Sequence, residues 1–204
     1  ISSGGTIYGM PTILPIPESH PTEPRVAYGI GKLAIEKYLA LFHRLHGLDY
    51  TVLRVANPYG ERQRVETSQG AVAAFIDRAL REQPIEIWGD GTITRDFCPG
   101  ADVVQANLLA ATGDLPGKAA RVFNVALGGS TTLDQLHALL AGATASLGAI
   151  QPLPLRYGPP REGDIIHSAA DITALREALG FEPSTSLATT LEETVRWYAA
   201  QAKG

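Results

Sequence analysis

The stretch R-V-A-Y-G-I-G-K-L-A-I-E-K-Y, residues 25 to 38, opens a segment in which apolar side chains recur with the period of a helix. The segment runs to about His46, and Gly47 is a candidate C-cap. The apolar run Y-T-V-L-R-V-A (50–56) then predicts a buried strand, which the turn N-P-Y-G (57–60) closes. A helix that leads back into a buried strand indicates a parallel α/β layer.

The rest of the chain repeats this alternation. A proline-rich segment (11–24) precedes the first helix and is predicted to be irregular surface chain. Asp102 is placed to cap a later helix. Further helices are expected over about 70–81, 102–112, 133–140, 171–179 and 187–202, and strands over 85–88, 122–126 and 153–157.

The composition excludes several classes of protein. The chain has 204 residues, of which 45% are apolar and 19% charged, as in ordinary globular proteins. A formal net charge of −4 argues against a broad basic surface for nucleic acid. Cys98 is the single cysteine, which fits a reducing compartment, and no apolar run approaches the ~20 residues of a membrane span. We expect a cytoplasmic protein that binds neither nucleic acid nor membrane, and we assign no metal ligands.

Tyr28 and Lys32 are the candidate reactive pair of the opening stretch. Residues four apart on a helix lie on one face. A phenol is a poor base at neutral pH, but a nearby ammonium favours the phenolate, and such a pair can move a proton to or from a hydroxyl or carbonyl. An amphipathic helix with a lysine on its exposed side has the same spacing, so spacing leaves both interpretations open.

Several short motifs follow one another in a defined order. They are I-S-S-G-G-T-I-Y-G (1–9), P-I-P-E (15–18), Y-G-I-G-K (28–32), L-R-V-A-N-P-Y-G-E-R-Q (53–63), G-D-G-T-I-T-R-D-F (89–97) and R-E-G-D (161–164). Together they resemble the extended short-chain dehydrogenases/reductases, and within them the nucleotide-sugar epimerases and dehydratases of UDP-glucose 4-epimerase type.

The resemblance implies an NAD-dependent 4-epimerase that acts on a UDP-sugar through a transient 4-keto intermediate. It implies an α/β fold: an incomplete Rossmann-type parallel sheet without its first four strands, plus a small α/β C-terminal substrate-binding domain. Residues 1–62 and 101–127 would form the nucleotide-binding domain, and 63–100 and 128–204 the substrate domain. A homodimer or higher self-association is expected, because a buried-type strand left at a sheet edge is open to pairing.

The resemblance also implies roles for individual residues. Tyr28 would be the catalytic base and acid, and Lys32 would hold the nicotinamide ribose. Asn57, Arg95 and Arg161 would contact the substrate diphosphate, a group that suits guanidinium donors. The other implied contacts are Ala56 and Pro58 to NAD, Val72 by its backbone and Trp88 by its ring to the nucleotide, and Asp164 to the ribose.

Ordinary structural interpretations of these residues stay open. Trp88 also suits a core position, and Asn57 before a proline is a common turn residue. Arg95 could form an ion pair with Asp90 or Asp96 instead of binding a ligand. Arg161 and Asp164 could pair with each other.

The sequence departs from the family pattern in its cofactor turn. No G-x-G-x-x-G follows a strand and opens a helix, so partners are expected only for the nicotinamide end of NAD. A UDP-sugar-binding chain without catalysis is therefore an alternative, as is a related nucleotide-sugar reductase or decarboxylase.

Two further departures concern the site itself. Gly4 stands where the family has its catalytic Ser or Thr, so Ser3 or Thr6 is expected to substitute. Gly5-Thr6 replaces the Asp-Glu pair of the dehydratases, which favours epimerisation. Cys98-Pro99-Gly100 replaces an apolar-aromatic stretch and is expected to loosen the chain after Arg95.

Overall fold

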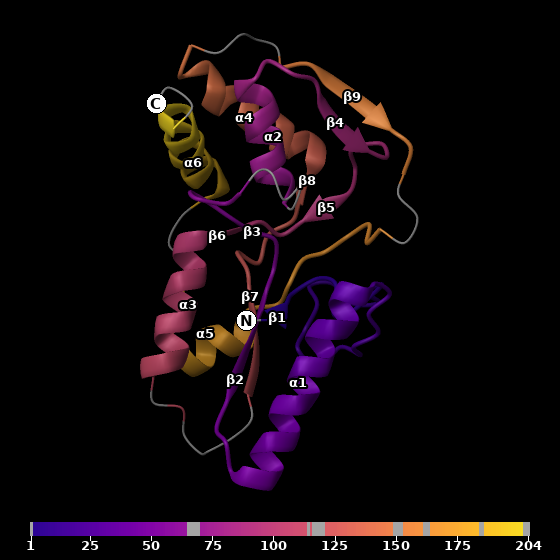
Figure 1. The fold of residues 1–204 in the computed structure, drawn as a ribbon, viewed down its shortest axis with the longest axis vertical. Helices are drawn as coiled ribbons and strands as arrows, with labels where there is room; N and C mark the ends of the chain where they lie inside the picture. Colours follow the sequence, from indigo (N-terminus) through magenta and orange to yellow (C-terminus); the bar gives the residue numbers. More distant parts are fainter. Residues whose placement is uncertain are drawn as a thin grey trace.

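A computed structural model describes residues 2–64, 70–113, 115, 121–148, 153–160, 164–183 and 186–201 (Figure 1). The helices are α1 (Ala27–His46), α2 (Ala71–Leu80), α3 (Gly100–Thr112), α4 (Leu133–Ala145), α5 (Thr173–Leu179) and α6 (Leu187–Gln201). The strands are β1 (Ser2–Ser3), β2 (Thr51–Val55), β3 (Pro58–Tyr59), β4 (Ile85–Trp88), β5 (Thr94–Arg95), β6 (Cys98–Pro99), β7 (Arg121–Val125), β8 (Thr131–Thr132) and β9 (Leu155–Gly158).

A three-stranded parallel sheet in the order β1-β2-β7 forms one half of the described chain. Successive side chains of a strand face opposite sides of a sheet. Leu53, Val55, Phe123 and Val125 accordingly share one hydrophobic cluster with side chains of α3 and α5. The opposite face buries Arg54 and Asn124 beneath α1 and the proline-rich segment. The sheet is therefore covered on both faces, as parallel strands require.

The other half contains the parallel pair β4–β9 together with α2, α4 and α6. These elements share a second hydrophobic cluster, which includes Ile76, Ile85, Leu136, Leu140 and Leu191. The pairs β3–β6 and β5–β8 join the two halves near the carboxyl edge of the main sheet. The predicted division into two domains stays a prediction. The segment around α5, which the prediction places in the substrate domain, packs with the main sheet.

The predicted alternation of helices and strands is confirmed, with ends shifted by a few residues, and Gly47 is the C-cap of α1 in the left-handed conformation. Asp102 as a helix cap was wrong, because α3 begins two residues earlier at Gly100, with Pro99 as its N-cap. The expected loosening is not found either: Cys98 is buried and β6 pairs with β3. The strand end expected at the start of the chain is found as β1, whereas the two-residue strands β3, β5, β6 and β8 were missed, since so short a segment carries no periodicity.

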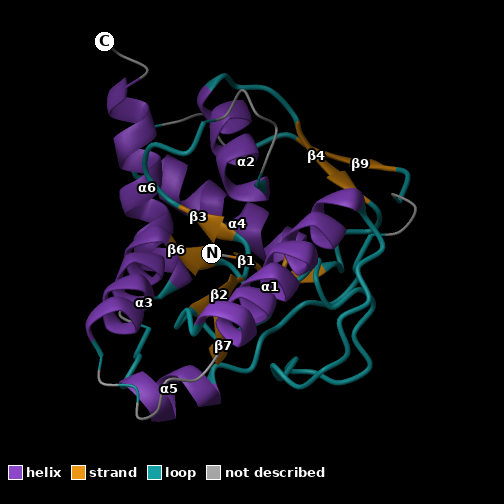
Figure 2. Ribbon diagram, turned by 60° about the horizontal axis from the view of Figure 1, so that its bottom comes forward, coloured by secondary structure: helices purple, strands orange, loops and turns teal. Residues whose placement is uncertain are grey.

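Helix α1 makes unusually little buried contact. Within α1, which is described throughout, the buried residues are Gly29 and Glu36. Figure 2 shows α1 at the surface, beside long loops. The expected apolar positions Ile35 and Phe42 are about half exposed. In the described part of the chain, no helix is both long and apolar enough to cross a membrane.

Candidate active site

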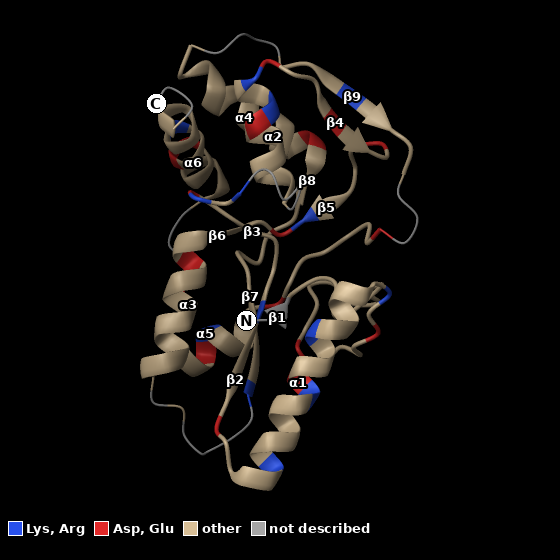
Figure 3. Cartoon of the chain, in the orientation of Figure 1, with Lys and Arg blue, Asp and Glu red and all other residues tan. Residues whose placement is uncertain are grey.

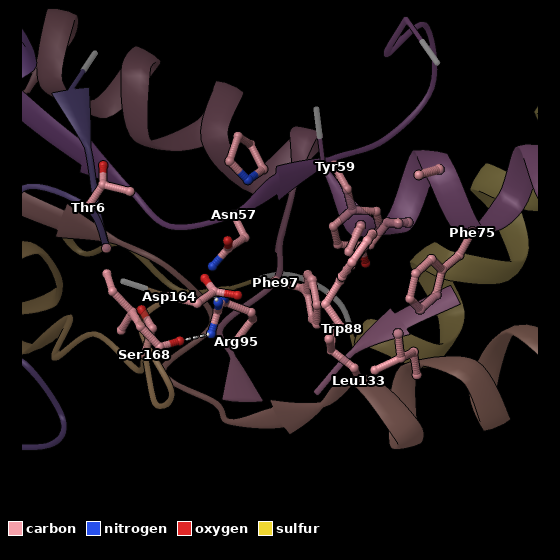
Figure 4. A pocket seen from close by; sticks show the side chains of 18 of the residues that line it. Thr6, Asn57, Tyr59, Phe75, Trp88, Arg95, Phe97, Leu133, Asp164 and Ser168 are labelled. Atoms are coloured by element: carbon pink, nitrogen blue, oxygen red, sulfur yellow. Dashed lines mark hydrogen bonds and ion pairs between the residues drawn. The ribbon is translucent and has the colours of Figure 1, made fainter. Parts of the chain in front are cut away.

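A cavity of about 950 Å³ lies between the carboxyl edge of the main sheet and the β4 region (Figure 4). Strand ends in a parallel sheet are the usual place for ligands. The cavity lining includes nine of the residues predicted from sequence or resemblance: Thr6, Tyr28, Lys32, Asn57, Pro58, Val72, Trp88, Arg95 and Asp164. The side chain of Ser3 and all of Arg161 lie outside what the structure describes. Ala56 is buried directly beneath this edge and is absent from the lining.

The first turns of α1 bring Tyr28 and Lys32 to the cavity on the side of Thr6, whose carbonyl oxygen lies against Gly29. The Lys32 Nζ lies 5.6 Å from the centre of the Tyr28 ring, which is a cation–π distance. Tyr28 is 57% exposed and lines the cavity. Both residues therefore occupy the same end of the site, as the one-turn spacing predicts.

Gly29 fixes how closely this turn approaches the sheet, and sequence reasoning missed it. A Cβ at Gly29 would lie 2.7 Å from the carbonyl oxygen of Thr6 and 2.9 Å from the Cβ of Pro24. No side chain larger than hydrogen fits there without displacing the backbone. A glycine inside a helix, which costs stability, was the available signal.

The hydroxyl groups at this end come from Thr6 and Ser168. Gly4 leaves no room for the family's usual Ser or Thr, because a Cβ there would lie 2.7 Å from the Ala56 nitrogen. Ser168 was missed in the sequence, where nothing distinguishes it from other serines. Its Oγ lies 3.1 Å from the position of a Cβ on Gly5, so Gly5 keeps space beside it.

Arg95 and Asn57 occupy the middle of the cavity. The Arg95 guanidinium donates to the carbonyl oxygen of Ile165 at 2.6 Å and to Asp164 Oδ1 at 3.0 Å. Burial lowers the pKa of Arg95, and the Asp164 carboxylate acts in the opposite direction. The alternative pairing with Asp90 or Asp96 was wrong, since the ion-pair partner is Asp164. Asn57 Nδ2 donates to the carbonyl oxygen of Asp96 at 3.1 Å.

Aromatic rings surround the other end of the cavity. Trp88 ends β4, and its ring lies beside Phe97 and near Phe75 (Figure 4). The structure leaves Trp88 half-buried and lining the cavity, so it is not a simple core residue. Val72 lies at the start of α2, where it is buried and lines the cavity. A flat aromatic ring in a cavity can pack against a planar base.

Asp96 is a buried acid that sequence reasoning treated only as a possible partner for Arg95. It is 1% exposed and accepts hydrogen bonds from the backbone nitrogens of Leu127 (3.0 Å), Gly128 (3.1 Å) and Ala170 (3.4 Å). Burial raises its pKa to about 6, although these backbone donors act to lower it. Only the folded chain brings these two segments to Asp96.

The charge pattern is mixed. Lys and Arg are interspersed with Asp and Glu over both halves (Figure 3). Among the described residues, no group of three or more His, Cys, Asp or Glu side chains could hold a metal ion. Tyr28, Lys32 and Pro58, which the family resemblance assigns to NAD, all line the cavity.

Comparison with known proteins gives consistent relatives. A sequence profile of the NAD dependent epimerase/dehydratase family matches residues 1–126. A putative UDP-glucose 4-epimerase of Methanocaldococcus jannaschii is 36% identical, over 96% of this chain and 61% of the relative. A UDP-glucose 4-epimerase of Mycolicibacterium smegmatis is 37% identical, over 97% of this chain and 60% of the relative.

Solved structures of UDP-glucose 4-epimerases also match the fold of this chain. The UDP-glucose 4-epimerase of Thermotoga maritima, crystallised with UDP-glucose, superposes with a TM-score of 0.90 at 42% identity. It is covered over 62% of its length, and 98% of this chain is matched. The UDP-glucose 4-epimerase of Thermus thermophilus, in complex with NAD, superposes with a TM-score of 0.85 at 30% identity. The match covers 97% of this chain and 62% of that one. The chain thus spans about 60% of the relatives that it matches, and on the profile match it belongs to the NAD-dependent epimerase/dehydratase family.

Proposed function

We propose that the protein functions as an NAD-dependent UDP-sugar 4-epimerase, or as the substrate-binding part of one. The observation that carries the proposal is one cavity that is lined by Tyr28 and Lys32, by Arg95 and Asn57 and by Trp88. Figure 4 shows Thr6 and Trp88 toward opposite ends with Arg95 and Asn57 between them, and the helix turn of Tyr28 packs against Thr6 through Gly29. A sugar, a diphosphate and a base follow one another in the same order in a UDP-sugar. The cavity therefore supplies a group of suitable chemistry for each part of that ligand.

In the proposed mechanism, Tyr28 takes the proton from the 4-hydroxyl of the sugar and later returns it. A hydroxyl group donates a hydrogen bond to the same oxygen and holds it near the phenol; the candidates are Thr6, Ser3 and Ser168. Lys32 holds the nicotinamide ribose and orients the tyrosine. NAD, when bound, supplies the reversible hydride acceptor for C4. The sugar exposes its other face while the nucleotide stays anchored.

The anchor is proposed to be the UDP moiety. Asn57, Arg95 and Arg161 contact the diphosphate, Trp88 packs on the uracil, Val72 contacts it through the backbone, and Asp164 binds the ribose. The Arg95–Asp164 ion pair supports this arrangement, because it holds the guanidinium at the cavity wall before a ligand arrives. Firm nucleotide contacts and few sugar contacts suit a reaction in which only the sugar must turn.

Epimerisation is favoured over dehydration by the residues beside the tyrosine. Gly5 and Thr6 stand where an Asp-Glu pair would be needed for dehydration, and Gly5 lies directly beside Ser168. A related reductase or decarboxylase would use the same Tyr28–Lys32 pair, and no observation favours it over the epimerase.

The second candidate function is UDP-sugar binding without catalysis. It is favoured by the residues of this chain, in which no glycine-rich dinucleotide turn follows a strand and opens a helix. Interconversion of UDP-glucose and UDP-galactose with catalytic NAD decides between the two. We expect interconversion and nicotinamide in the purified protein; binding of UDP with no detectable binding of NAD would rule out catalysis by this chain.

We further propose that β1, β2 and β7 are strands of a Rossmann-type sheet. We also propose that a second copy of the chain covers the exposed apolar side of α1. Ile35, Tyr38, Phe42 and Leu45 recur at spacings of three and four, and each is between 47% and 64% exposed. They form one apolar stripe opposite the buried Glu36, a pattern typical of helix–helix association.

A further inference from the structure

Asp96 ties two distant segments of the described chain to the middle of the cavity. Its Oδ1 accepts from Leu127, just after β7, and its Oδ2 accepts from Gly128 and from Ala170, just before α5. None of these three partners lines the cavity. The carboxylate thus connects the carboxyl edge of the main sheet with the chain that carries Arg95.

The same residue holds two of the groups assigned to the diphosphate, Arg95 and Asn57. Arg95 is its neighbour in the chain, so the direction of the Arg95 backbone follows from the anchoring of Asp96. The carbonyl oxygen of Asp96 accepts from Asn57 Nδ2 at 3.1 Å, and Asn57 in turn follows the end of β2. The backbone nitrogen of Cys98 donates to the Asn57 carbonyl at 3.1 Å, which fixes the two segments side by side.

A buried acid costs free energy unless its oxygens accept hydrogen bonds. At Asp96 these donors are backbone N–H groups, which cannot rotate away, so they define the position of the carboxylate closely. Aspartate is suited to this place because both oxygens accept, whereas an asparagine would set an N–H group against a backbone N–H group.

We propose that Asp96 is a positioning residue for the substrate diphosphate: its buried carboxylate holds Arg95 and Asn57 in register with each other at the cavity wall. The inference rests on the proposed UDP-sugar function. A purely structural role would lower the stability of the fold without selecting one part of the ligand.

The test compares Asp96→Asn with Asp90→Asn, a matched removal of an exposed acid whose Oδ1 accepts hydrogen bonds from Thr92 in the same segment. Affinities for UDP and for uridine, which lacks the diphosphate, are measured by calorimetry. Asp96→Asn should lower the affinity for UDP by about tenfold or more and change the affinity for uridine less than twofold. The reason is that a misplaced diphosphate-binding group loses its contact steeply with distance. Equal weakening of both ligands, or no weakening of UDP, would overturn the proposal.

A second measurement does not depend on ligand binding. The side-chain amide of Asn57 and the Nε–H of Arg95 are followed by ¹⁵N-resolved NMR in the unliganded proteins. Both resonances should shift in Asp96→Asn and stay in place in Asp90→Asn; unchanged resonances in Asp96→Asn would refute the positioning role. Wild-type protein that binds neither UDP nor uridine would instead refute the proposed function, with the NMR result still deciding the role of Asp96.

If Asp96→Asn does not fold, Asp96→Ser takes its place, since a serine removes the charge without opposing the backbone donors. If neither folds, hydrogen exchange of wild-type Leu127 and Gly128 amides decides. UDP should increase their protection through Asp96, although neither residue lines the cavity; unchanged protection with UDP bound would contradict the proposal.

Discussion

Removing the carboxylate of Glu36 is expected to be the most damaging single change on α1. Glu36 accepts two hydrogen bonds from Arg54, at 2.7 and 3.1 Å, and the two side chains are only 8% and 7% exposed. Burial lowers the pKa of Arg54, but its hydrogen bonds to Glu36 and Tyr8 outweigh this and raise it. Glu36→Gln would therefore leave a buried guanidinium, which stays charged, without its counter-ion.

The expected cost follows from the geometry. Breaking one partner of a buried, hydrogen-bonded ion pair costs about 3–5 kcal/mol. Arg54 keeps its hydrogen bond to the Tyr8 hydroxyl at 2.9 Å, which places the expected loss near the lower end, at about 3 kcal/mol. With a urea m-value of about 2–3 kcal/mol/M, the unfolding midpoint should fall by about 1–1.5 M.

The assay is urea unfolding followed by far-UV circular dichroism, with Glu182→Gln as the matched control. Glu182 pairs with Arg176 at 3.1 Å, but these side chains are 68% and 48% exposed, so the control should lose at most about 0.5 kcal/mol. Equal small losses in both variants would refute the reasoning that the Glu36–Arg54 pair anchors α1.

Four further outcomes are expected. Gly29→Ala should destabilise the protein, because its Cβ would lie 2.7 Å from a backbone oxygen, whereas Gly31→Ala, with open space, should stabilise it by up to about 1 kcal/mol in thermal unfolding. Between about pH 4 and pH 7 the free energy of unfolding of the wild type should fall by about 2–3 kcal/mol relative to that of Asp96→Asn. The pKa of Asp96 is raised to about 6 in the folded chain, and the stability that this gives is lost as the pH rises through that value. Parallel pH profiles of the two proteins would count against this. Trp88→Leu should reduce the binding free energy of UDP, measured by calorimetry, by about 1–2 kcal/mol. An unchanged affinity would refute the assignment of the Trp88 ring to the base site. Phe42→Lys should reduce the mass seen by light scattering to that of one chain; a wild type that is already monomeric would refute the α1 association.

The long elements could be predicted because their periodicity is local. The helix around Tyr28 and Lys32 and the strand that precedes Asn57 were identified from sequence alone, and both lie where expected. The catalytic and binding roles assigned to these residues stay predictions. What the structure adds is that they line one cavity together with Trp88 and Arg95.

The features that were missed depend on contacts between distant segments. Asp164, the ion-pair partner of Arg95, lies 69 residues further along the chain, and charge spacing favoured the nearer acids. The backbone donors around Asp96 carry no side-chain signature at all. The weak burial of α1 was also hidden, because its apolar residues Ile35 and Phe42 have a helical period whether a partner covers them or not.

The most direct test of the central claim is the comparison of wild type with Tyr28→Phe, which removes one oxygen atom. Interconversion of UDP-glucose and UDP-galactose is measured with added NAD, and UDP affinity is measured by calorimetry on the same samples. We predict that turnover falls by about 10²–10⁴-fold while the UDP affinity changes less than about twofold. Retained turnover in Tyr28→Phe, or a loss of UDP affinity as large as the loss of turnover, would contradict the assignment of Tyr28 as the acid and base of the site.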